Sequence, residues 1–200
     1  MTKFIDYYFS PMSPWTYLGH ARFERIAKRA GAAVNVKPVD YGRIFPASGG
    51  LPLAKRAPQR QAYRLVELQR WREYLGVPLN LHPKFFPVDT TSASLLIVAA
   101  GAKEGQEAAF KLSGALLRSV WVEERNLADT QTLKAIAKEQ GLSGDDLFAR
   151  AQAPEAKSGY DAFTQEAMDR QVFGAPTYVY NGELFWGQDR LDFLERALAR

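Results

Sequence analysis

The first forty residues hold two apolar stretches with a helical pattern between them. Phe4–Phe9 is apolar and aromatic with one interruption, which predicts a buried strand. After a polar break at Ser10–Pro14, apolar residues recur at helical spacing, and we expect the helix to begin near Trp15 or Thr16. Ala33–Val39 then predicts a second strand. Strand, helix and strand in this order form a βαβ unit with a right-handed crossover.

The middle of the chain is helical in its pattern after one loop. Asp40–Pro58 is rich in glycine and proline, which predicts a loop. Gln59–Leu75 has apolar residues on one stripe and predicts a helix that ends at Gly76. After a proline-marked link over Val77–Val88, helical patterns continue almost unbroken to Arg170. About a hundred helical residues therefore follow the βαβ unit.

The carboxyl end returns to β structure. Thr177–Tyr180 and Glu183–Trp186 flank Asn181–Gly182, the dipeptide best suited to a two-residue type I′ hairpin turn. A final helix is expected over Arg190–Ala199. The order βαβ, helical block, ββα is that of an α/β protein with a thioredoxin-like fold and a large all-helical insertion. We expect residues 1–58 and 171–200 to form the thioredoxin-like domain, and residues 59–170 the inserted helical domain.

Composition narrows the chemistry that this fold can perform. The 200 residues include no cysteine, which excludes disulfides, thiolate metal sites and thiol redox chemistry by the chain itself. His20 and His82 lack neighbours at metal-ligand spacing, so no metal is expected. The formal charge of +4 is mild, and the arginines and lysines between residues 55 and 72 form a poor nucleic-acid footprint.

The chain also lacks the sequence signs of a membrane or secreted protein. A charge interrupts the first apolar stretch, which is untypical of a signal peptide, and no apolar run approaches membrane-spanning length. We therefore expect a cytoplasmic protein with no nucleic-acid or membrane partner.

The segment Ser13–Thr16 joins the first strand to the first helix. In an open α/β sheet this position lies at the carboxyl edge of a strand, where ligands commonly bind. A helix N-terminus offers unpaired N–H groups and a partial positive charge, and the Ser13 hydroxyl could add a hydrogen bond to an anion such as a thiolate. Alternatively, Ser13 or Thr16 simply caps the helix, with Pro14 in its first turn, which is the commoner role of such a residue.

A second candidate lies just before the predicted hairpin, in Phe173–Thr177. A proline that enters a strand is unusual because it withholds a hydrogen bond from the ladder. If the Ala175–Pro176 bond is cis, the backbone of Ala175 is exposed and can pair with an extended peptide. The alternative is an ordinary trans proline, which is the commoner form of any single bond before proline.

Together these segments resemble the DsbA-type branch of thioredoxin-fold proteins. Within that branch, Ser13–Gly19 resembles the Ser-Pro-x-Ser-x-Leu-Gly signature of kappa-class glutathione transferases and 2-hydroxychromene-2-carboxylate isomerases. Trp186–Arg190 resembles their Phe-Gly-Ser-Asp-Arg segment, and Phe85–Pro87 resembles their Phe-Pro link. The similarity runs from about Phe4 to Leu198.

The resemblance implies glutathione as cofactor. Ser13 matches the serine that hydrogen-bonds the glutathione sulfur, and Ala175–Pro176 matches the pair, with a cis proline, whose backbone binds the cysteinyl unit. Gln188–Asp189 matches the Ser-Asp pair that holds the γ-glutamyl end. Arg60 falls where many relatives have a lysine near the glycyl carboxylate. The resemblance also implies a homodimer.

Two residues depart from the family pattern. Gln188 replaces a serine, which keeps donor and acceptor capacity but needs more room. Asp89 stands where many of the isomerases have asparagine, and a carboxylate there would repel an acidic substrate. We expect Trp15, Thr16 and Asp89 to line the substrate pocket.

Several of these residues also have structural explanations. Asp189 is a plausible N-cap of the last helix, and Arg60 could simply be solvated on a basic helix. His20 could face the same side of the first helix as Thr16, although a histidine on a partly buried helix face usually finds a local partner.

The favoured interpretation is a glutathione-dependent isomerase that acts on 2-hydroxychromene-2-carboxylate-like compounds, with Ser13 stabilising the thiolate. Two alternatives remain open from the sequence. One is a kappa-like glutathione transferase or peroxidase. The other is a non-catalytic peptide-binding module that has lost its cysteines and kept its cis-proline groove.

Overall fold

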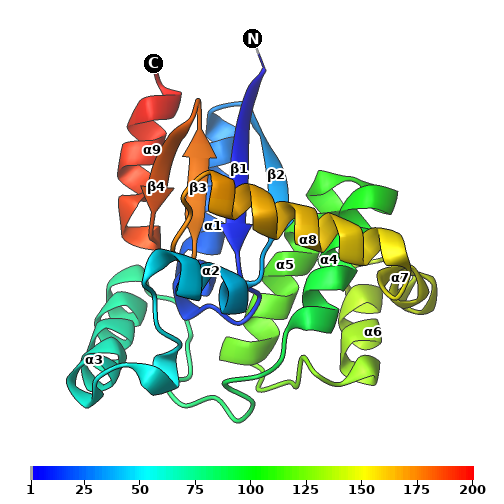
Figure 1. Ribbon diagram of the computed structural model, residues 1–200, viewed down its shortest axis with the longest axis horizontal. Helices are drawn as coiled ribbons and strands as arrows, with labels where there is room; N and C mark the ends of the chain where they lie inside the picture. Colours follow the sequence, from blue (N-terminus) through cyan, green and yellow to red (C-terminus); the bar gives the residue numbers. More distant parts are fainter. Residues whose placement is uncertain (1) are drawn as a thin grey trace.

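The computed structural model describes residues 2–200 and places their strands in one mixed sheet of order β2-β1-β3-β4 (Figure 1). β1 pairs in parallel with β2 and antiparallel with β3, and β4 pairs antiparallel with β3 at the edge of the sheet. The expected thioredoxin-like arrangement of strands is therefore present. The strands are β1 (Lys3–Phe9), β2 (Ala32–Pro38), β3 (Thr177–Tyr180) and β4 (Glu183–Trp186).

Helices cover both faces of the sheet, and further helices form a block beside its β2 edge. α8 and α2 lie across the near face in Figure 1, while α1 lies behind the sheet and α9 beside β4. α4, α5, α6 and α7 form the block to the right of β2. The helices are α1 (Pro14–Arg29), α2 (Tyr41–Ser48), α3 (Pro58–Leu75), α4 (Thr91–Glu104), α5 (Gln106–Trp121), α6 (Thr130–Glu139), α7 (Gly144–Ala151), α8 (Pro154–Asp169) and α9 (Leu191–Leu198), with short 3₁₀ turns η1 (Leu53–Lys55) and η2 (Gln188–Arg190).

The two cores follow from the alternation of side chains along β1. Successive residues of a strand point to opposite faces. Ile5, Tyr7 and Phe9 enter the main core, which is shared with α1, α4 and α5. Tyr8 enters a smaller core on the other face, built with α2 and α8. No described helix is both long enough and apolar enough to cross a membrane.

The prediction of a loop over residues 40–58 is wrong, because this segment contains α2 and η1. Asp40 caps α2 by accepting a hydrogen bond from the N–H of Gly42 at 2.8 Å, and Tyr41 and Ile44 are buried on its inner face. Gly49 ends the helix with a left-handed φ of 72°. Pro46 lies inside this helix, although a segment rich in proline and glycine predicts a loop.

The other local predictions hold to within two residues. Both hairpin strands have the expected bounds, and Asn181 and Gly182 have φ values of 51° and 82°, as a type I′ turn requires. Gly76 ends α3 in the left-handed region. The helix predicted to start near Trp15 begins at Pro14 instead, because Ser13 is its N-cap. Turns and helix caps depend on neighbouring residues, and they can therefore be predicted from the sequence.

Candidate active site

Ser13 is the N-cap of α1 and lies at the carboxyl end of β1. Its Oγ accepts a hydrogen bond from the backbone N–H of Thr16 at 3.2 Å, and Pro14 occupies the first helical position. The capping role considered for this serine is therefore present. It leaves the hydroxyl hydrogen of Ser13 free, because capping uses only a lone pair of the oxygen.

The first turn of α1 suits an anion. It contains no acidic residue. Its positive dipole end is not neutralised, and Pro14 brings no N–H of its own. The N–H of Trp15 has no hydrogen-bond partner within residues 2–200, so it can bind a ligand together with the Ser13 hydroxyl. Two donors thus converge where β1 gives way to α1.

The Ala175–Pro176 segment lies at the same edge of the sheet. Tyr8 of β1 pairs with Thr177 of β3, so the residues before Thr177 run alongside the end of β1 that leads to Ser13. The Ala175–Pro176 bond is cis, as the resemblance implies. Within the described chain, no hydrogen bond involves the backbone N–H or carbonyl of Ala175. This residue can therefore pair with an extended ligand.

Gln188 is brought to this edge through Gly187, whose N–H donates to the carbonyl of Pro176 at 2.8 Å. Its side chain is only 1% exposed and packs against Gly19 of α1, where any β-carbon would lie 2.7 Å from the Cβ of Gln188. Oε1 of Gln188 accepts a hydrogen bond from Nη1 of Arg22 at 3.4 Å. The extra room that glutamine needs in place of serine is provided by the glycine.

Asp189 does not cap the last helix, contrary to the structural explanation offered for it. It lies inside η2, and its carboxylate forms an ion pair with Arg190 at 2.7 Å. Arg190 occupies the N-cap position of α9 and makes no side-chain capping bond. The Asp189 side chain is 40% exposed, which leaves it accessible to an ammonium group of a ligand.

The four remaining predicted residues have different environments. Trp15 is half-buried against the main core, at the start of α1. Thr16 is fully buried, so its side chain does not line an open pocket, and its contribution to the site is the N–H that binds Ser13. Arg60 is exposed in the first turn of α3, and none of the ion pairs within residues 2–200 includes it. Asp89 lies two residues before α4, and its carboxylate accepts hydrogen bonds from the N–H and hydroxyl of Thr91, which lower the pKa of its carboxyl group.

His20 is buried in the core behind this site. Its ring stacks on Phe110 with centroids 4.1 Å apart, and Nδ1 lies 3.2 Å from the hydroxyl of Tyr7. Burial lowers the pKa of His20 to about 4. The side chain is therefore a neutral part of the aromatic core at physiological pH, as the local-partner interpretation expected.

Sequence reasoning missed two arginines near these residues. Arg22 contacts Gln188 from α1, and its position one turn after Gly19 was a signal that could have been used. Arg64 of α3 is partly buried on the rings of Phe86 and Trp121. Nothing in the local pattern distinguishes it from the other arginines of that helix.

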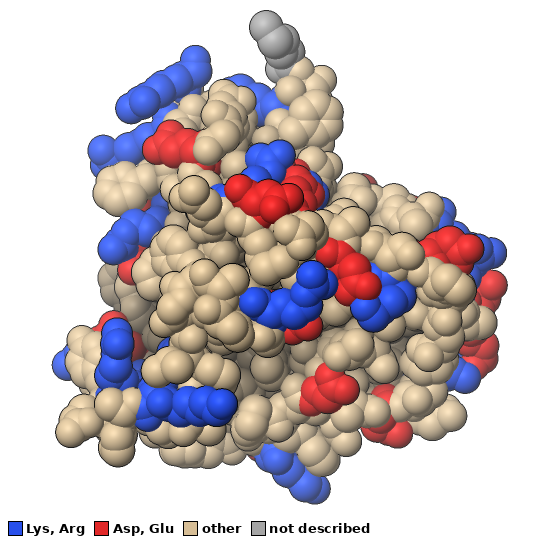
Figure 2. Space-filling model, viewed as in Figure 1, with Lys and Arg blue, Asp and Glu red and all other residues tan. Residues whose placement is uncertain are grey.

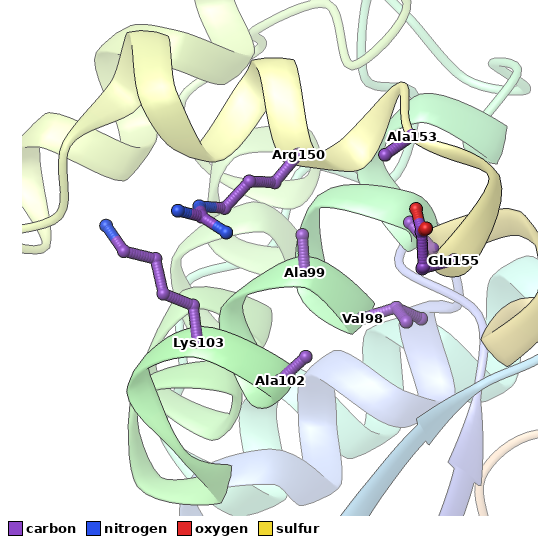
Figure 3. Close-up of a pocket in the computed structure, with 8 residues that line it drawn as sticks. Val98, Ala99, Ala102, Lys103, Arg150, Ala153 and Glu155 are labelled. Carbon is purple, nitrogen blue, oxygen red and sulfur yellow. The ribbon is translucent and has the colours of Figure 1, made fainter.

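A separate surface hollow of about 250 Å³ lies between α4, α7 and α8 (Figure 3). Lys103 and Arg150 extend to the same side of the view with their charged ends toward each other, and both form ion pairs with Asp146. Its walls are otherwise mostly alanine. None of the predicted site residues lines this hollow. Among residues 2–200, no three acidic or histidine side chains gather closely enough to hold a metal ion.

Comparison with known proteins shows the family and the fold of this chain. The model of the DSBA-like thioredoxin domain family matches residues 4–199. The chain is 31% identical to 2-hydroxychromene-2-carboxylate isomerase from Sphingobium xenophagum over 99% of both proteins. It is 32% identical to the Pseudomonas putida protein of the same name, over 98% of this chain and 94% of that protein.

The chain belongs to the 2-hydroxychromene-2-carboxylate isomerase family. A solved 2-hydroxychromene-2-carboxylate isomerase structure superimposes with a TM-score of 0.83 and 28% identity, covering 98% of this chain and 95% of that one. Membership of this isomerase family confirms the expected enzyme class and the DsbA-like thioredoxin fold with its helical insertion.

More distant relatives extend the comparison. Human glutathione S-transferase kappa 1 is 23% identical over 99% of this chain and 92% of that protein. The cytosolic disulfide reductase DsbM from Pseudomonas aeruginosa, in a structure with GSH, has a TM-score of 0.70 at 17% identity, covering 98% of this chain and all of that one. The likeness to this reductase is one of fold.

Proposed function

We propose that this enzyme isomerises a 2-hydroxychromene-2-carboxylate-like compound with glutathione as cofactor. The observation that carries the proposal is that hydrogen-bond donors for a thiolate and an unpaired backbone segment lie at the same edge of the sheet. Ser13 and the N–H of Trp15 offer donors for a thiolate, and the backbone of Ala175 has no partner in the described chain. Named isomerases of the family at 31% and 32% identity support the reaction class.

The residues at this edge fit a thiol-containing peptide. The chain has no cysteine, so the reacting sulfur must come from a bound molecule. An extended peptide can pair with the backbone of Ala175, as peptides add to exposed strand edges elsewhere. Gln188 and Asp189 directly follow Gly187, where the Gln188 amide and the Asp189 carboxylate can bind an amino-acid end. These contacts suit the cysteinyl and γ-glutamyl units of glutathione.

Ser13 and the helix N-terminus stabilise negative charge on sulfur. A free thiol has a pKa near roughly 8.5, so modest stabilisation of the anion gives a substantial thiolate fraction at neutral pH. When bound, glutathione supplies a thiolate that can add to the conjugated ring and leave again after rotation about the former double bond. Ser13 donates to the sulfur before addition and again after elimination, and the Trp15 N–H supports the same charge.

The Ser13→Ala variant tests the proposal directly. We expect a loss of about tenfold to a hundredfold in kcat/KM, since one hydrogen bond to a charged group contributes about 1.5–3 kcal/mol. The matched control is Asp129→Ala, which removes the N-cap of α6 far from the site. The control should lose similar stability and no activity.

Binding of glutathione is measured on the same proteins. Glutathione at about a hundred times its dissociation constant should stabilise the wild type by roughly 2.7 kcal/mol. Turnover that needs no glutathione, or full activity in Ser13→Ala, would contradict the proposal.

The kappa-class relative favours a second candidate, a glutathione transferase or peroxidase. The two chemistries are separated by assaying a chromene carboxylate and 1-chloro-2,4-dinitrobenzene side by side. Conjugation without isomerisation would favour the transferase. A peptide-binding module would instead bind an extended peptide and fail to bind millimolar glutathione in calorimetry.

A further inference from the structure

Arg64 is a partly buried arginine that forms no ion pair with any other residue between positions 2 and 200. Its Nη2 is enclosed and has no hydrogen-bond partner within residues 2–200. The guanidinium lies over the rings of Phe86, at 5.1 Å, and Trp121, at 5.8 Å. Buried charges in proteins are nearly always paired, because leaving water without a partner costs several kcal/mol. An unpaired arginine in this setting therefore indicates a missing anion.

The one charged residue that perturbs the pKa of Arg64 among residues 2–200 is itself basic. Burial, with a smaller contribution from Arg56, lowers the pKa of Arg64 to about 10. The pKa of Arg56 is also lowered, by burial first and then by the positive charge of Arg60. Arg60 and Arg64 are four residues apart in α3 and share one side of its start, while Arg56 lies in the extended segment just before the helix. No ion pair within the described chain includes any of them. Basic side chains prevail over the α3 region at the lower left of Figure 2.

Arg64 is not alone in lacking a partner. The indole N–H of Trp121 and the hydroxyl of Thr16 are also enclosed without a hydrogen bond. Arginine and the indole nitrogen can only donate, so an acceptor satisfies both. Three elements, α1, α3 and α5, thus each carry an unsatisfied polar group.

The packing of α1 on α5 places Arg64 near the Ser13 end of α1. His20 of α1 lies against Phe110 and Gly114 of α5. One turn earlier in α1, burial raises the pKa of Tyr17 against the opposing charge of Arg118, which lies one turn later in α5. The two helices are therefore antiparallel, and one further turn along each brings the start of α1 level with Trp121. α3 also contacts α1.

We propose that the Arg64 guanidinium binds a carboxylate of the small molecule that reacts at Ser13. The inference rests on the proposed function, and it assigns to Arg64 the anion recognition that the resemblance implies for Arg60. Both the glycyl end of glutathione and the chromene carboxylate carry this group. An arginine stacked on two aromatic rings presents a fixed planar fork, which matches a carboxylate in geometry and charge.

The test compares Arg64→Met with Arg70→Met. Methionine keeps an unbranched apolar side chain over Phe86 and Trp121 and removes the charge. Arg70 lies on the same helix beside the ring of Tyr63, but it already forms an ion pair with Glu67 at 2.9 Å. We measure the dissociation constants of glutathione and glutathione ethyl ester, and the KM of the chromene carboxylate.

Arg64→Met should weaken one carboxylate interaction by at least about tenfold, and Arg70→Met should not. If glutathione binding weakens while the ethyl ester binds equally to both proteins, Arg64 holds the glycyl carboxylate. If glutathione binding is unchanged and the KM rises, it holds the substrate carboxylate. Either result supports the inference.

The inference is overturned if the wild type binds glutathione and turns over the substrate, yet Arg64→Met changes neither. Failure of the wild type in both assays would instead count against the proposed function. Measuring the unfolding midpoint of Arg64→Met distinguishes a binding role from a purely structural one. Removing an unpaired buried charge should leave this midpoint unchanged or raised. Arg64→Lys, which keeps the charge without the fork, should show an intermediate affinity.

Discussion

The Ser13 side chain is bound to the first turn of its own helix through Thr16, whose N–H lies 3.2 Å from Ser13 Oγ. This bond fixes the hydroxyl at the end of β1 and leaves its hydrogen to point elsewhere. Capping and thiolate stabilisation are therefore compatible roles for one serine. Because they use different parts of the hydroxyl, substitutions can separate them.

Ser13→Asp should keep the cap and abolish the chemistry. Aspartate is as good an N-cap as serine, so the free energy of unfolding should stay within about 0.5 kcal/mol of the wild type. Its carboxylate cannot donate to a thiolate and repels it, so glutathione binding and turnover should be lost. Urea unfolding and calorimetry check the two parts. Retained turnover with an intact cap would contradict a thiolate role for Ser13.

Gly19→Ala should disturb the Gln188 side of the site. A β-carbon at this position would lie 2.7 Å from the Cβ of Gln188 and 3.1 Å from the hydroxyl of Tyr178, both in buried residues. We expect a loss of about 1–3 kcal/mol in stability, with a higher KM for glutathione. Gly101→Ala in α4 is the control, because there the nearest atom is the tip of the Gln106 side chain. Equal effects of the two substitutions on the KM would remove Gln188 from the site.

Asp89→Asn should lower the KM for an anionic substrate. The amide oxygen of asparagine can still accept the hydrogen bonds from Thr91, so stability should change little, while the negative charge is removed. A relief of about 1 kcal/mol in repulsion corresponds to roughly a fivefold lower KM. Asp145→Asn on α7 serves as the control for net charge. An unchanged KM in Asp89→Asn would place this residue outside the substrate pocket.

His20 should make stability depend on pH below neutrality. Burial lowers the pKa of His20 to about 4, against opposing effects of Glu24 and the Phe110 carbonyl. The unfolded chain, with a pKa near roughly 6.5, binds the proton first as pH falls. The stabilisation is therefore complete above about pH 6.5 and is lost progressively toward pH 4, by at most about 1.4 kcal/mol per pH unit.

The His20→Phe variant should flatten this dependence between about pH 6.5 and 5. Denaturant unfolding at a series of pH values measures it, and His82→Gln, at an exposed histidine, is the control. An unchanged slope in His20→Phe would show that other groups cause the dependence.

Lys37→Met should destabilise the smaller core face. The Lys37 ammonium, only 12% exposed, pairs with Asp6 at 2.9 Å and Glu166 at 2.8 Å. Removing it leaves two partly buried carboxylates, Asp6 and Glu166, whose remaining shared cation among the described residues is Arg170. We expect a loss of about 2–3 kcal/mol in urea unfolding, below the 3–5 kcal/mol of a fully buried pair. Lys28→Met, at an exposed pair with Glu24, should cost about 0.5 kcal/mol or less, and an equal cost in both would contradict this ranking.

Local patterns were sufficient for most elements and for part of the site. The hairpin turn at Asn181–Gly182 and the stop at Gly76 depend on the conformations of one or two residues, so they are predictable from sequence. The serine at the strand–helix junction was recognisable for the same reason. Local rules failed at α2, where burial of Tyr41 and Ile44 outweighs the presence of glycine and proline.

The sequence by itself determined that any reacting sulfur is external, because the chain has no cysteine. Only the tertiary structure decided which residues meet. The pairing of Tyr8 with Thr177 joins segments about 170 residues apart and sets Ala175 beside the end of β1. Packing buries Thr16 and leaves Arg64 without a counterion in the part of the chain that the structure describes. Such contacts depend on how distant surfaces fit together, and no spacing along the chain encodes them.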